Sequence, residues 1–329
     1  MPQTGAVHSL PPVSELVARL RAAPAWQRKR DLQLLSQGTL RLPDDVGDDA
    51  VALPDGDGYL LLAAEVMWPP FVAVEPELAG RSAVLANAND IYAMGGRPIA
   101  LLDTLLAPGI AEAGAVMRGI AAGAVRYGVP VLGGHLTLEA EMTSVAVFIV
   151  GRARRLLSGR AATAGDVLLL LTASEGRFHE RFPFWDCSLD RSDADLRRDL
   201  ELLPEIAEAG LCDAARDVSM PGVLGSALQF LEGSGVGAEI DLRAIPYPAD
   251  ARGREELWLQ SFPSYGFLLS VEESCVEEIV ARATSRDRVC APIGRVTAEP
   301  RVELIDGSAR ACLWDFAAEP FCGFGRPAP

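Results

Sequence analysis

The segment Asn87-Ala-Asn-Asp-Ile-Tyr-Ala-Met-Gly-Gly-Arg-Pro98 is the most informative part of this chain. It places carboxamide and carboxylate groups on an otherwise apolar helix that ends in two glycines. Asn87 and Asp90 are three residues apart, so they project from the same side of that helix. Both side chains can offer an oxygen to a hard cation or to a hydrated phosphate, whereas a helix that is only structural does not need them. We therefore expect a ligand site on this helix.

Two further polar segments flank this helix in the sequence. Upstream, Val46-Gly-Asp-Asp-Ala-Val51 places two carboxylates next to a glycine. Downstream, Leu132-Gly-Gly-His-Leu-Thr137 is predicted to form a loop whose two glycines let the backbone approach a ligand closely. Because the three polar segments occur within a short part of the chain, they indicate one binding site.

Composition and charge exclude one class of function. The 329 residues include 45 acidic and 30 basic side chains, which gives a formal net charge of −15. A surface this negative repels a nucleic-acid backbone, and no basic face with interleaved aromatic residues offsets it. We therefore expect no nucleic-acid partner, and an anionic small substrate only where a divalent metal or helix N-termini screen the charge.

Export and membrane signals are not visible in the sequence. Residues 1–12 lack a basic start followed by an apolar run, and the most apolar windows, such as 143–151, have the length of strands. The six cysteines are scattered without any C-x-x-C pair, so we expect reduced thiols and no metal site built from cysteine. These features predict a cytoplasmic protein that does not enter the membrane.

Strand-like and helix-like segments alternate along the first half of the chain. The apolar run 58–64 is predicted to be a buried strand. Helices are predicted over 75–95, ending in a left-handed glycine, and over 110–127, and strands over 129–132 and 144–150. Together these segments predict one α/β domain.

The basic connector 152–155 marks a change of character, and a new strand is predicted to begin at Gly165. We therefore expect three parts: an N-terminal extension over 1–37, a first domain over 38–152 and a second domain over 153–329. A polar, mobile insertion is expected over 177–195. Further helices are predicted over 195–209, 221–233 and 272–283, and further strands over 238–242, 266–271 and 291–296.

Six motifs, taken in order, resemble those of the AIR synthase superfamily, also called PurM-like. This group includes thiamine-monophosphate kinase, selenophosphate synthetase, AIR synthase and the hydrogenase-maturation carbamoyl dehydratase. The resemblance covers roughly residues 38 to 300. The motifs are Gly47-Asp-Asp-Ala50, Asn89-Asp-Ile-Tyr-Ala-Met-Gly-Gly-Arg-Pro98, Tyr127-Gly-Val-Pro-Val-Leu-Gly-Gly134, Ser158-Gly-Arg-Ala-Ala-Thr-Ala-Gly-Asp166, Arg216-Asp-Val-Ser219 and Ser234-Gly-Val-Gly-Ala238.

This resemblance implies a two-domain α/β fold, of the α+β kind, in which the N-terminal sheet forms a dimeric barrel with a second subunit. It implies a C-terminal α/β domain beside it, with ATP between the domains and magnesium ions on the ATP phosphates. The implied chemistry is attack on the γ-phosphate by an oxygen of a small substrate. Clustered carboxylates in an acidic protein are consistent with this, because cations are needed to neutralise them.

The resemblance also assigns roles to individual residues. Its metal ligands correspond to acidic side chains, one of which, Asp217, is also a candidate catalytic residue. Taken alone, each of these acids is equally well explained as a solvated turn or a helix cap. The implied metal ligands are Asp48, Asp49, Asp90, Asp217 and Glu65, and the implied ATP-binding residues are Asn87, Asp90, Gly133 and Gly134.

Two departures from the family motifs bear on activity. His135 stands where the kinase branch has an aspartate, and Met220-Pro221 stands where the family has an acid followed by glycine. His135 is either a general acid or base near the phosphoryl acceptor, since imidazole titrates near neutral pH, or a structural loop residue. The lysine-bearing, glycine-rich N-terminal segment of selenophosphate synthetase is absent, so selenophosphate chemistry is not expected.

The sequence therefore predicts a homodimeric enzyme that binds ATP with magnesium and activates a small molecule by phosphoryl transfer, as a kinase or an ATP-dependent ligase or cyclase. The alternative is a non-catalytic nucleotide-binding subunit that regulates or scaffolds a biosynthetic complex. A third interpretation, a dehydratase that uses a carrier thiol, depends on Cys322 alone, and free cysteine is more often a small apolar filler.

Overall fold

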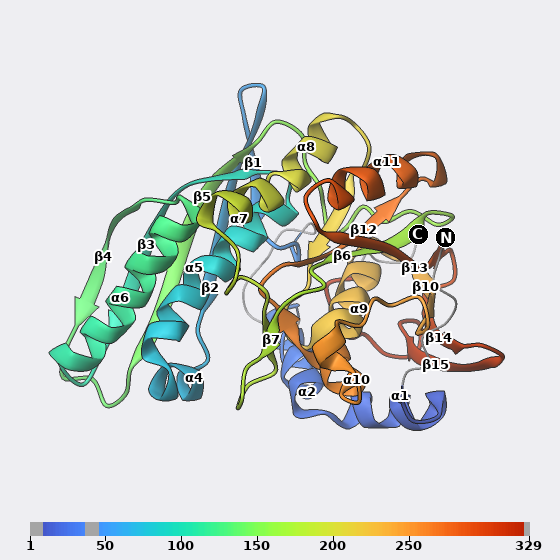
Figure 1. Ribbon diagram of the computed structural model, residues 1–329, viewed down its shortest axis with the longest axis horizontal. Coiled ribbons are helices and arrows are strands. Elements are labelled where there is room, and N and C mark those ends of the chain that lie inside the picture. The colour runs from blue at the N-terminus through green and yellow to red at the C-terminus, as the bar shows by residue number, and fades with distance from the viewer. Residues whose placement is uncertain (1–8, 37–45, 326–329) are drawn as a thin grey trace. The chain divides into compact units, whose positions relative to one another are not determined.

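The computed structural model describes residues 9–36 and 46–325, and the chain divides into two compact units (Figure 1). Unit 1 contains Met1–Asp48, Leu157–Asp190 and Ala209–Pro329, and unit 2 contains Asp49–Leu156 and Arg191–Glu208. The segment 191–208 therefore belongs with the first half of the chain, although unit 1 flanks it on both sides in the sequence.

Unit 2 is built on a five-stranded sheet in the order β1-β2-β5-β3-β4. β3 and β4 are parallel and are connected through α6, whereas the other neighbouring strands are antiparallel. The strands are β1 (Val51–Asp55), β2 (Gly58–Val66), β3 (Arg97–Leu106), β4 (Val131–Thr137) and β5 (Ser144–Ala153), and the helices are α4 (Pro69–Val74), α5 (Pro76–Ala93), α6 (Ile110–Tyr127), α7 (Asp193–Leu200) and α8 (Leu202–Glu208).

Helices α5 and α6 lie side by side against one face of this sheet (Figure 1). They pack closely because glycines face backbone across the contact. A Cβ atom at Gly119 of α6 would lie 1.9 Å from the Glu77 carbonyl oxygen, and one at Gly80 of α5 would lie 2.2 Å from the Val116 carbonyl oxygen. The two predicted helices are confirmed, and α5 is followed by Gly95 with φ +73°, the expected left-handed end.

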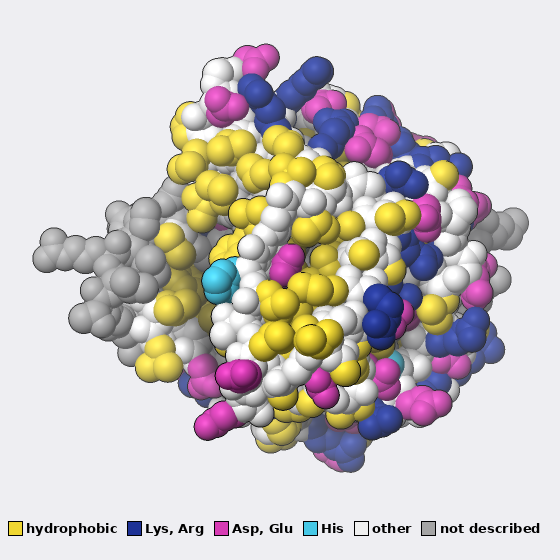
Figure 2. Space-filling view, turned by 90° about the vertical axis from the view of Figure 1, so that its left-hand side faces the viewer, with side chains coloured by type: hydrophobic (Ala, Val, Ile, Leu, Met, Phe, Trp, Pro, Cys, Tyr) yellow, Lys and Arg dark blue, Asp and Glu magenta, His cyan; other side chains and the backbone are white. Residues whose placement is uncertain are grey.

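The opposite face of the sheet is apolar and exposed. Leu61 of β2 is fully buried, but its neighbour Leu62 is 40% exposed, so the prediction of a buried strand over 58–64 holds for only one face. Figure 2 shows hydrophobic side chains gathered on the side of the molecule where β4 and α6 lie. The exposed apolar residues on this open face are Val51, Leu53, Leu62, Val66, Leu102, Leu106 and Phe148.

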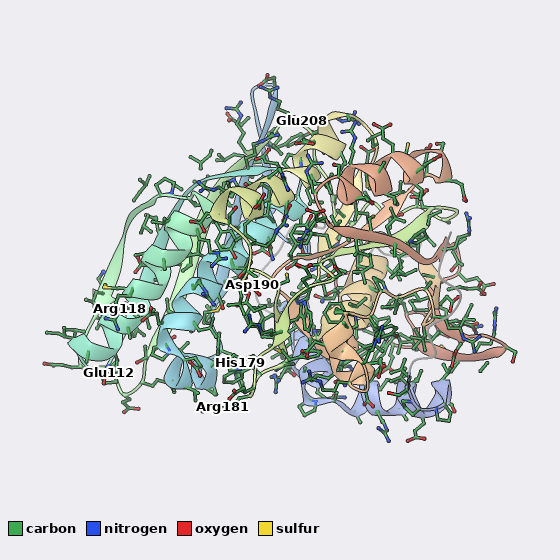
Figure 3. The ribbon with its side chains drawn as sticks, viewed as in Figure 1. Glu112, Arg118, His179, Arg181, Asp190 and Glu208 are labelled. Atoms are coloured by element: carbon green, nitrogen blue, oxygen red, sulfur yellow. The ribbon has the colours of Figure 1, made fainter. Side chains whose placement is uncertain are left out.

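Ion pairs connect α8 to the sheet of unit 2. The Arg97 guanidinium, at the start of β3, donates to Glu201 at 2.8 Å and to Glu208 at 2.6 Å. Glu208 ends α8, close to the β1–β2 hairpin (Figure 3). Each of the three side chains is about one-third exposed, so we expect the network to contribute only about 1 kcal/mol.

Unit 1 contains a seven-stranded sheet in the order β15-β14-β10-β13-β6-β12-β9. Every residue of β6 and of β12 is buried, as expected of apolar strands that are covered on both faces. The strands are β6 (Val167–Thr172), β9 (Ala214–Asp217), β10 (Gly237–Asp241), β12 (Gly266–Val271), β13 (Val289–Thr297), β14 (Arg301–Asp306) and β15 (Ala309–Asp315), and the helices are α9 (Gly222–Ser234), α10 (Glu255–Gln260) and α11 (Glu273–Thr284), with a 3₁₀ turn at Ala249–Ala251.

The prediction of a polar, mobile insertion over 177–195 is wrong. Strands β7 (Arg177–Phe178), β8 (Phe184–Asp186) and β11 (Phe262–Pro263) form a small three-stranded sheet. Trp185 is fully buried there, with its ring edge-on to Phe178 at 4.8 Å and to Trp258 at 5.4 Å. The segment is ordered because its aromatic side chains form a core, which the surrounding polar residues obscured in the sequence.

Residues 9–36, the described part of the N-terminal extension, contain three helices and belong to unit 1. These helices are α1 (Val13–Ala22), α2 (Pro24–Arg30) and α3 (Gln33–Ser36), and residues 37–45 of the predicted extension and first domain lie outside the described residues. Leu16, Leu20 and Trp26 are fully buried. All six cysteines are free of disulfides, as predicted. Among the described residues, no helix combines the length and the apolar character that crossing a bilayer requires.

Candidate functional site

The Asp48 carboxylate is held by a turn in unit 1. Ser158 Oγ donates to Asp48 Oδ2 at 2.5 Å, and the Gly159 amide donates to Asp48 Oδ1 at 2.8 Å. A Cβ atom at Gly159 would lie 2.7 Å from Asp48 Oδ1, so the close approach requires glycine there. These contacts orient the carboxylate in the way that outer partners orient a metal-ligating carboxylate.

Two buried arginines hold the Asp48 segment, and one of them, Arg216, lies on the strand that carries Asp217. Arg216 of β9 donates to the Gly47 carbonyl at 3.0 Å, and Arg160 donates to the Val46 carbonyl at 2.8 Å. Asp217 follows Arg216 and is itself only 7% exposed. The structure therefore brings the Asp48 and Asp217 segments of unit 1 together. Arg160 and Arg216 both stand inside motifs of the sequence, but neither was assigned a role there.

Asn87 and Asp90 lie in the buried part of α5. Asn87 is fully buried, and its Nδ2 donates to the Ala83 carbonyl at 2.9 Å. Its Oδ1 is buried and accepts no hydrogen bond from the described residues. An unsatisfied buried oxygen costs about 1–3 kcal/mol, which marks Asn87 as a residue to be explained by a ligand or a water. Asp90 is 7% exposed.

Glu65 lies in a row of paired residues that crosses the sheet of unit 2. In the strand register, Glu65 pairs with Val147, Val147 pairs with Asp103, and Asp103 pairs with Gly134. Val147 is fully buried, so this row faces the side that α5 and α6 cover. Burial raises the pKa of the Asp103 carboxyl. The motifs did not point to Asp103. Its signal in the sequence is that it is the single acid within the apolar run 101–106.

The sequence predicted a loop over 132–137. This segment instead forms most of the edge strand β4. Gly134 sits beside Asp103, because a Cβ atom there would lie 2.6 Å from Asp103 Oδ2. His135 pairs with Thr104 and faces the open side of the sheet, so His135 and Glu65 point to opposite faces. The His135 ring lies 3.2 Å from the Thr137 hydroxyl. Gly133 is exposed on the same strand.

The structure assembles part of the predicted site within each unit. Asp49 belongs to unit 2, directly before the buried Ala50 and β1. Within residues 9–36 and 46–325, no three His, Cys, Asp or Glu side chains form a group that could hold a metal ion. Magnesium commonly takes only one or two carboxylates and completes its shell with water and phosphate oxygens. Within unit 1 the oriented Asp48 carboxylate fits such a metal, and within unit 2 the orphaned Asn87 oxygen is a separate position that fits a ligand or a water.

The surroundings of Cys322 and of His179 indicate structural rather than catalytic roles. Cys322 is 3% exposed, and burial raises the pKa of its thiol to about 12, so the thiol is a poor nucleophile. His179 Nδ1 accepts from the Arg181 and Phe182 amides in the β7–β8 hairpin, where His179 and Arg181 lie together (Figure 3). Burial supports the assignment of Cys322 as a small apolar filler.

Two family models match this chain. The description "AIR synthase related protein, N-terminal domain" matches residues 47–153, and "AIR synthase related protein, C-terminal domain" matches residues 163–307. The chain belongs to the AIR synthase related family. The membership accounts for the ordered motifs, and the observed two-unit α/β architecture confirms the expected PurM-like fold.

Relatives within the AIR synthase related family include a dikinase and a protein solved in complex with ATP. An uncharacterized protein of Synechocystis is 39% identical over 319 residues, which are 95% of this chain and 98% of that protein. Selenide, water dikinase of Aeromonas salmonicida is 27% identical over 302 residues, covering 84% of this chain and 83% of that enzyme. The structure of T. maritima PurL complexed with ATP has a TM-score of 0.69 at 21% identity, covering 85% of this chain and about half (47%) of the PurL chain.

Proposed function

We propose that this protein is an enzyme that binds ATP with magnesium and transfers the γ-phosphoryl group to an oxygen of a small molecule. The observation that carries the proposal is the held carboxylate of Asp48, whose segment is joined to the Asp217 strand in a member of this family. Related proteins that use or bind ATP support it. Because phosphoryl transfer is catalysed mainly by positioning and charge neutralisation, an oriented oxygen ligand is the feature to expect.

The proposed roles follow the positions of the acids. Asp48 and Asp217 are proposed as magnesium ligands from unit 1, and Asp49, Glu65 and Asp90 as ligands from unit 2. Magnesium, when bound with ATP, supplies the positive charge that neutralises the phosphates in a chain of net charge −15. Asn87, Gly133 and Gly134 are proposed to contact the nucleotide.

A test compares the parent with Asp90→Asn and Asp217→Asn. ATP should raise the melting temperature of the parent strongly only with magnesium present, because a ligand that binds the native state stabilises it by mass action. Each variant should reduce this magnesium-dependent shift. Asp57→Asn is the matched control, because the Asp57 side chain is 93% exposed in the β1–β2 turn. If the parent shows no such shift, the nucleotide proposal fails, and if the two variants behave like the control, the residue assignment fails.

A specific observation favours a second candidate, a non-catalytic nucleotide-binding subunit. Met220-Pro221 occupies the positions of an acid and a glycine in the family motif and leads directly into α9. Single-turnover measurement of ATP hydrolysis with candidate metabolites separates the two functions. The enzyme hydrolyses or transfers the γ-phosphate when its substrate is present, whereas the scaffold binds magnesium-ATP and leaves it intact.

We also propose that the protein is a homodimer that associates through the open face of the unit 2 sheet, and that it works in the cytoplasm. Monomeric proteins rarely expose an apolar surface of this extent. Phe148, in the central strand β5 and 45% exposed, lies within this face. Light scattering at micromolar concentration should give twice the monomer mass of 35.0 kDa. Phe148→Asp should give the monomer, whereas Val125→Asp, on the exposed side of α6, should remain a dimer.

A further inference from the structure

The C-terminal segment 321–325 is fixed to unit 1 at its start by a buried acid. Glu232 of α9 is 4% exposed, and its carboxylate accepts from the amides of Phe321 and Cys322, both at 2.7 Å, and of Gly323 at 3.3 Å. Hydrogen bonds from backbone amides to an ionised carboxylate are among the stronger ones in proteins. The segment is therefore held by its backbone, independently of its side chains.

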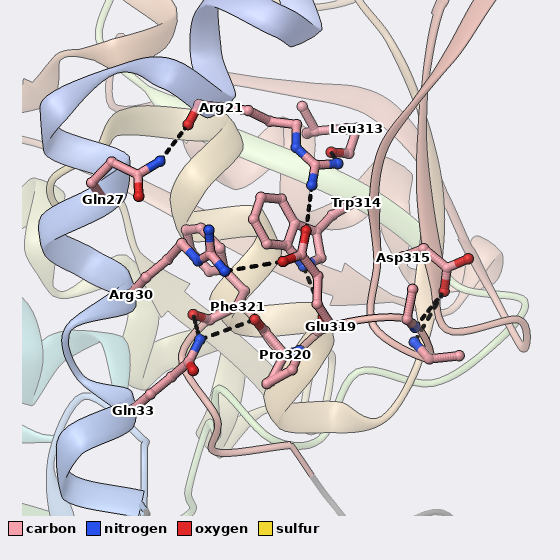
Figure 4. A network of polar contacts seen from close by, with 12 residues as sticks. Arg21, Gln27, Arg30, Gln33, Leu313, Trp314, Asp315, Glu319, Pro320 and Phe321 are labelled. Carbon is pink, nitrogen blue, oxygen red and sulfur yellow. Dashed lines mark hydrogen bonds and ion pairs between the residues drawn. The ribbon is translucent and has the colours of Figure 1, made fainter.

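The N-terminal helices hold the two residues just before this segment and its first residue, Phe321 (Figure 4). Arg30 of α2 pairs with Glu319 at 3.0 Å, and Arg21 of α1 pairs with the same carboxylate. Gln33 of α3 donates to the carbonyls of Pro320 at 3.1 Å and Phe321 at 3.0 Å. The two ends of the described chain are thus joined to each other by side-chain contacts.

The far end of this C-terminal segment touches the Asp48 loop. The Phe324 carbonyl accepts from Arg160 Nη1 at 2.7 Å, and the same nitrogen donates to the Val46 carbonyl at 2.8 Å. Gly47 has φ +109°, and a Cβ atom there would lie 2.6 Å from Phe324 Cβ and 2.9 Å from Phe324 Cγ. Phe324 therefore packs directly against the residue that precedes Asp48.

We propose that Phe324 is a positioning residue for Asp48, so that the C-terminal segment forms one wall of the magnesium-ATP site. The inference rests on the proposed function of Asp48. The Ser158–Gly159 turn holds the Asp48 carboxylate, and Phe324 with Arg160 holds the backbone on the other side of Gly47. A ligand fixed from both sides loses less freedom when the metal binds, which raises metal affinity.

This role differs from that of a mobile carrier tail. A tail that delivers a thiol must detach from the protein and move. This segment is instead anchored through the amides of Phe321, Cys322 and Gly323, and Phe324 contacts the loop that contains Asp48. The residues that anchor the segment to Glu232 come directly before Phe324, which contacts the loop that contains Asp48. A movement of the segment would therefore release the Asp48 loop.

The test is a magnesium titration of the full chain at saturating ATP, with binding followed well below the melting temperature. Phe324→Ala should raise the half-saturating magnesium concentration about tenfold, as loss of an outer partner of a metal ligand does. Its affinity for ATP in EDTA should not change, because Phe324 acts on the ligand only through Asp48 and the metal. Phe324→Leu, which restores apolar contact with Gly47, should recover most of the loss. Phe182→Ala, another half-buried phenylalanine of unit 1, is the matched control.

Glu232→Gln is the second variant, because it loosens the segment at its other end while keeping the size of the side chain. It should move the magnesium midpoint in the same direction as Phe324→Ala. If both variants keep the parent's magnesium midpoint, the positioning role is wrong even though the proposed function stands. If the parent itself shows no magnesium-dependent ATP binding, the proposed function is wrong, and with it this inference.

Discussion

Two glycines of helix α6 should respond in opposite directions to the same substitution. Gly114 and Gly119 are both interior residues of α6, but their surroundings differ. A Cβ atom at Gly114 would meet only the Arg118 Nη1 atom, at 3.7 Å. At Gly119 it would lie 1.9 Å from the Glu77 carbonyl oxygen and 2.9 Å from the Arg81 amide nitrogen, both of which are backbone of α5. Gly114→Ala is therefore a control with the same chemistry and no clash.

The magnitudes follow from these distances. Alanine is preferred over glycine inside a helix by about 1 kcal/mol, so Gly114→Ala should increase the free energy of unfolding by up to that amount. At Gly119 a carbon and a carbonyl oxygen normally stay roughly 3.3 Å apart, so the two helices would have to separate by roughly 1.4 Å. Overpacking of this kind costs about 1–3 kcal/mol or more, which exceeds the gain in helix propensity. We expect the two variants to differ by about 3 kcal/mol.

Urea denaturation, followed by far-ultraviolet circular dichroism, measures this difference. Both variants should keep the slope of the parent, and their midpoints should move to opposite sides of it. Because α5 carries Asn87 and Asp90, Gly119→Ala should also weaken the magnesium-dependent effect of ATP. A Gly119→Ala protein as stable as Gly114→Ala would show that the α5–α6 contact is not tight, and the reasoning from the glycine contacts would be refuted.

Four further predictions concern thiols, catalysis and ion pairs. A thiol reagent should label two cysteines of the native protein, the half-exposed Cys275 and the exposed Cys312, and all six after denaturation. Burial raises the pKa of the Cys212 thiol from its ordinary value of 9.0 to about 12. This thiol therefore stabilises the fold below pH 9, and that contribution should be lost as the pH rises from 9 towards 12 in alkaline unfolding experiments. Because His135 faces the open side of the sheet, opposite Glu65, His135→Ala should leave single-turnover phosphoryl transfer close to the parent rate, and a loss of about 100-fold or more would instead identify a general acid or base. Arg97→Met should lower the free energy of unfolding by about 1 kcal/mol in urea at low salt and by less at high salt, and a loss independent of salt would exclude an ionic cause.

The sequence predicted those elements whose period and boundaries are local. Helix α6 begins and ends where the sequence predicted, and β12 matches its predicted bounds, because an unbroken apolar pattern bounded by glycine needs no tertiary information. The prediction of a loop over 132–137 was wrong because the glycines there are required by contact with a neighbouring strand. Gly134 avoids the Asp103 side chain, and that pairing between residues far apart in the chain is not visible in a local pattern.

The candidate site was predictable in its residue types and less so in its arrangement. The acids near Gly47 and in the 216–219 motif were found by their motifs, and the structure joins the two segments through Arg216. The orientation of His135 depends on strand register, which sets it on the face opposite Glu65. Phe324 lay beyond every motif, since its contact with Gly47 spans most of the chain.

The path of the chain through unit 2 has a consequence for biosynthesis. Residues 191–208 belong to unit 2, although they are translated after β6, the first strand of unit 1's large sheet. When residue 156 has left the ribosome, unit 2 still lacks α7 and α8, and Arg97 lacks both of its glutamate partners. Unit 2 is therefore completed only after part of unit 1 has been made. A cut at residue 156 would yield a first fragment that lacks α7 and α8 and a second fragment that carries these two helices of unit 2. The two units should therefore be studied by co-expression rather than one at a time.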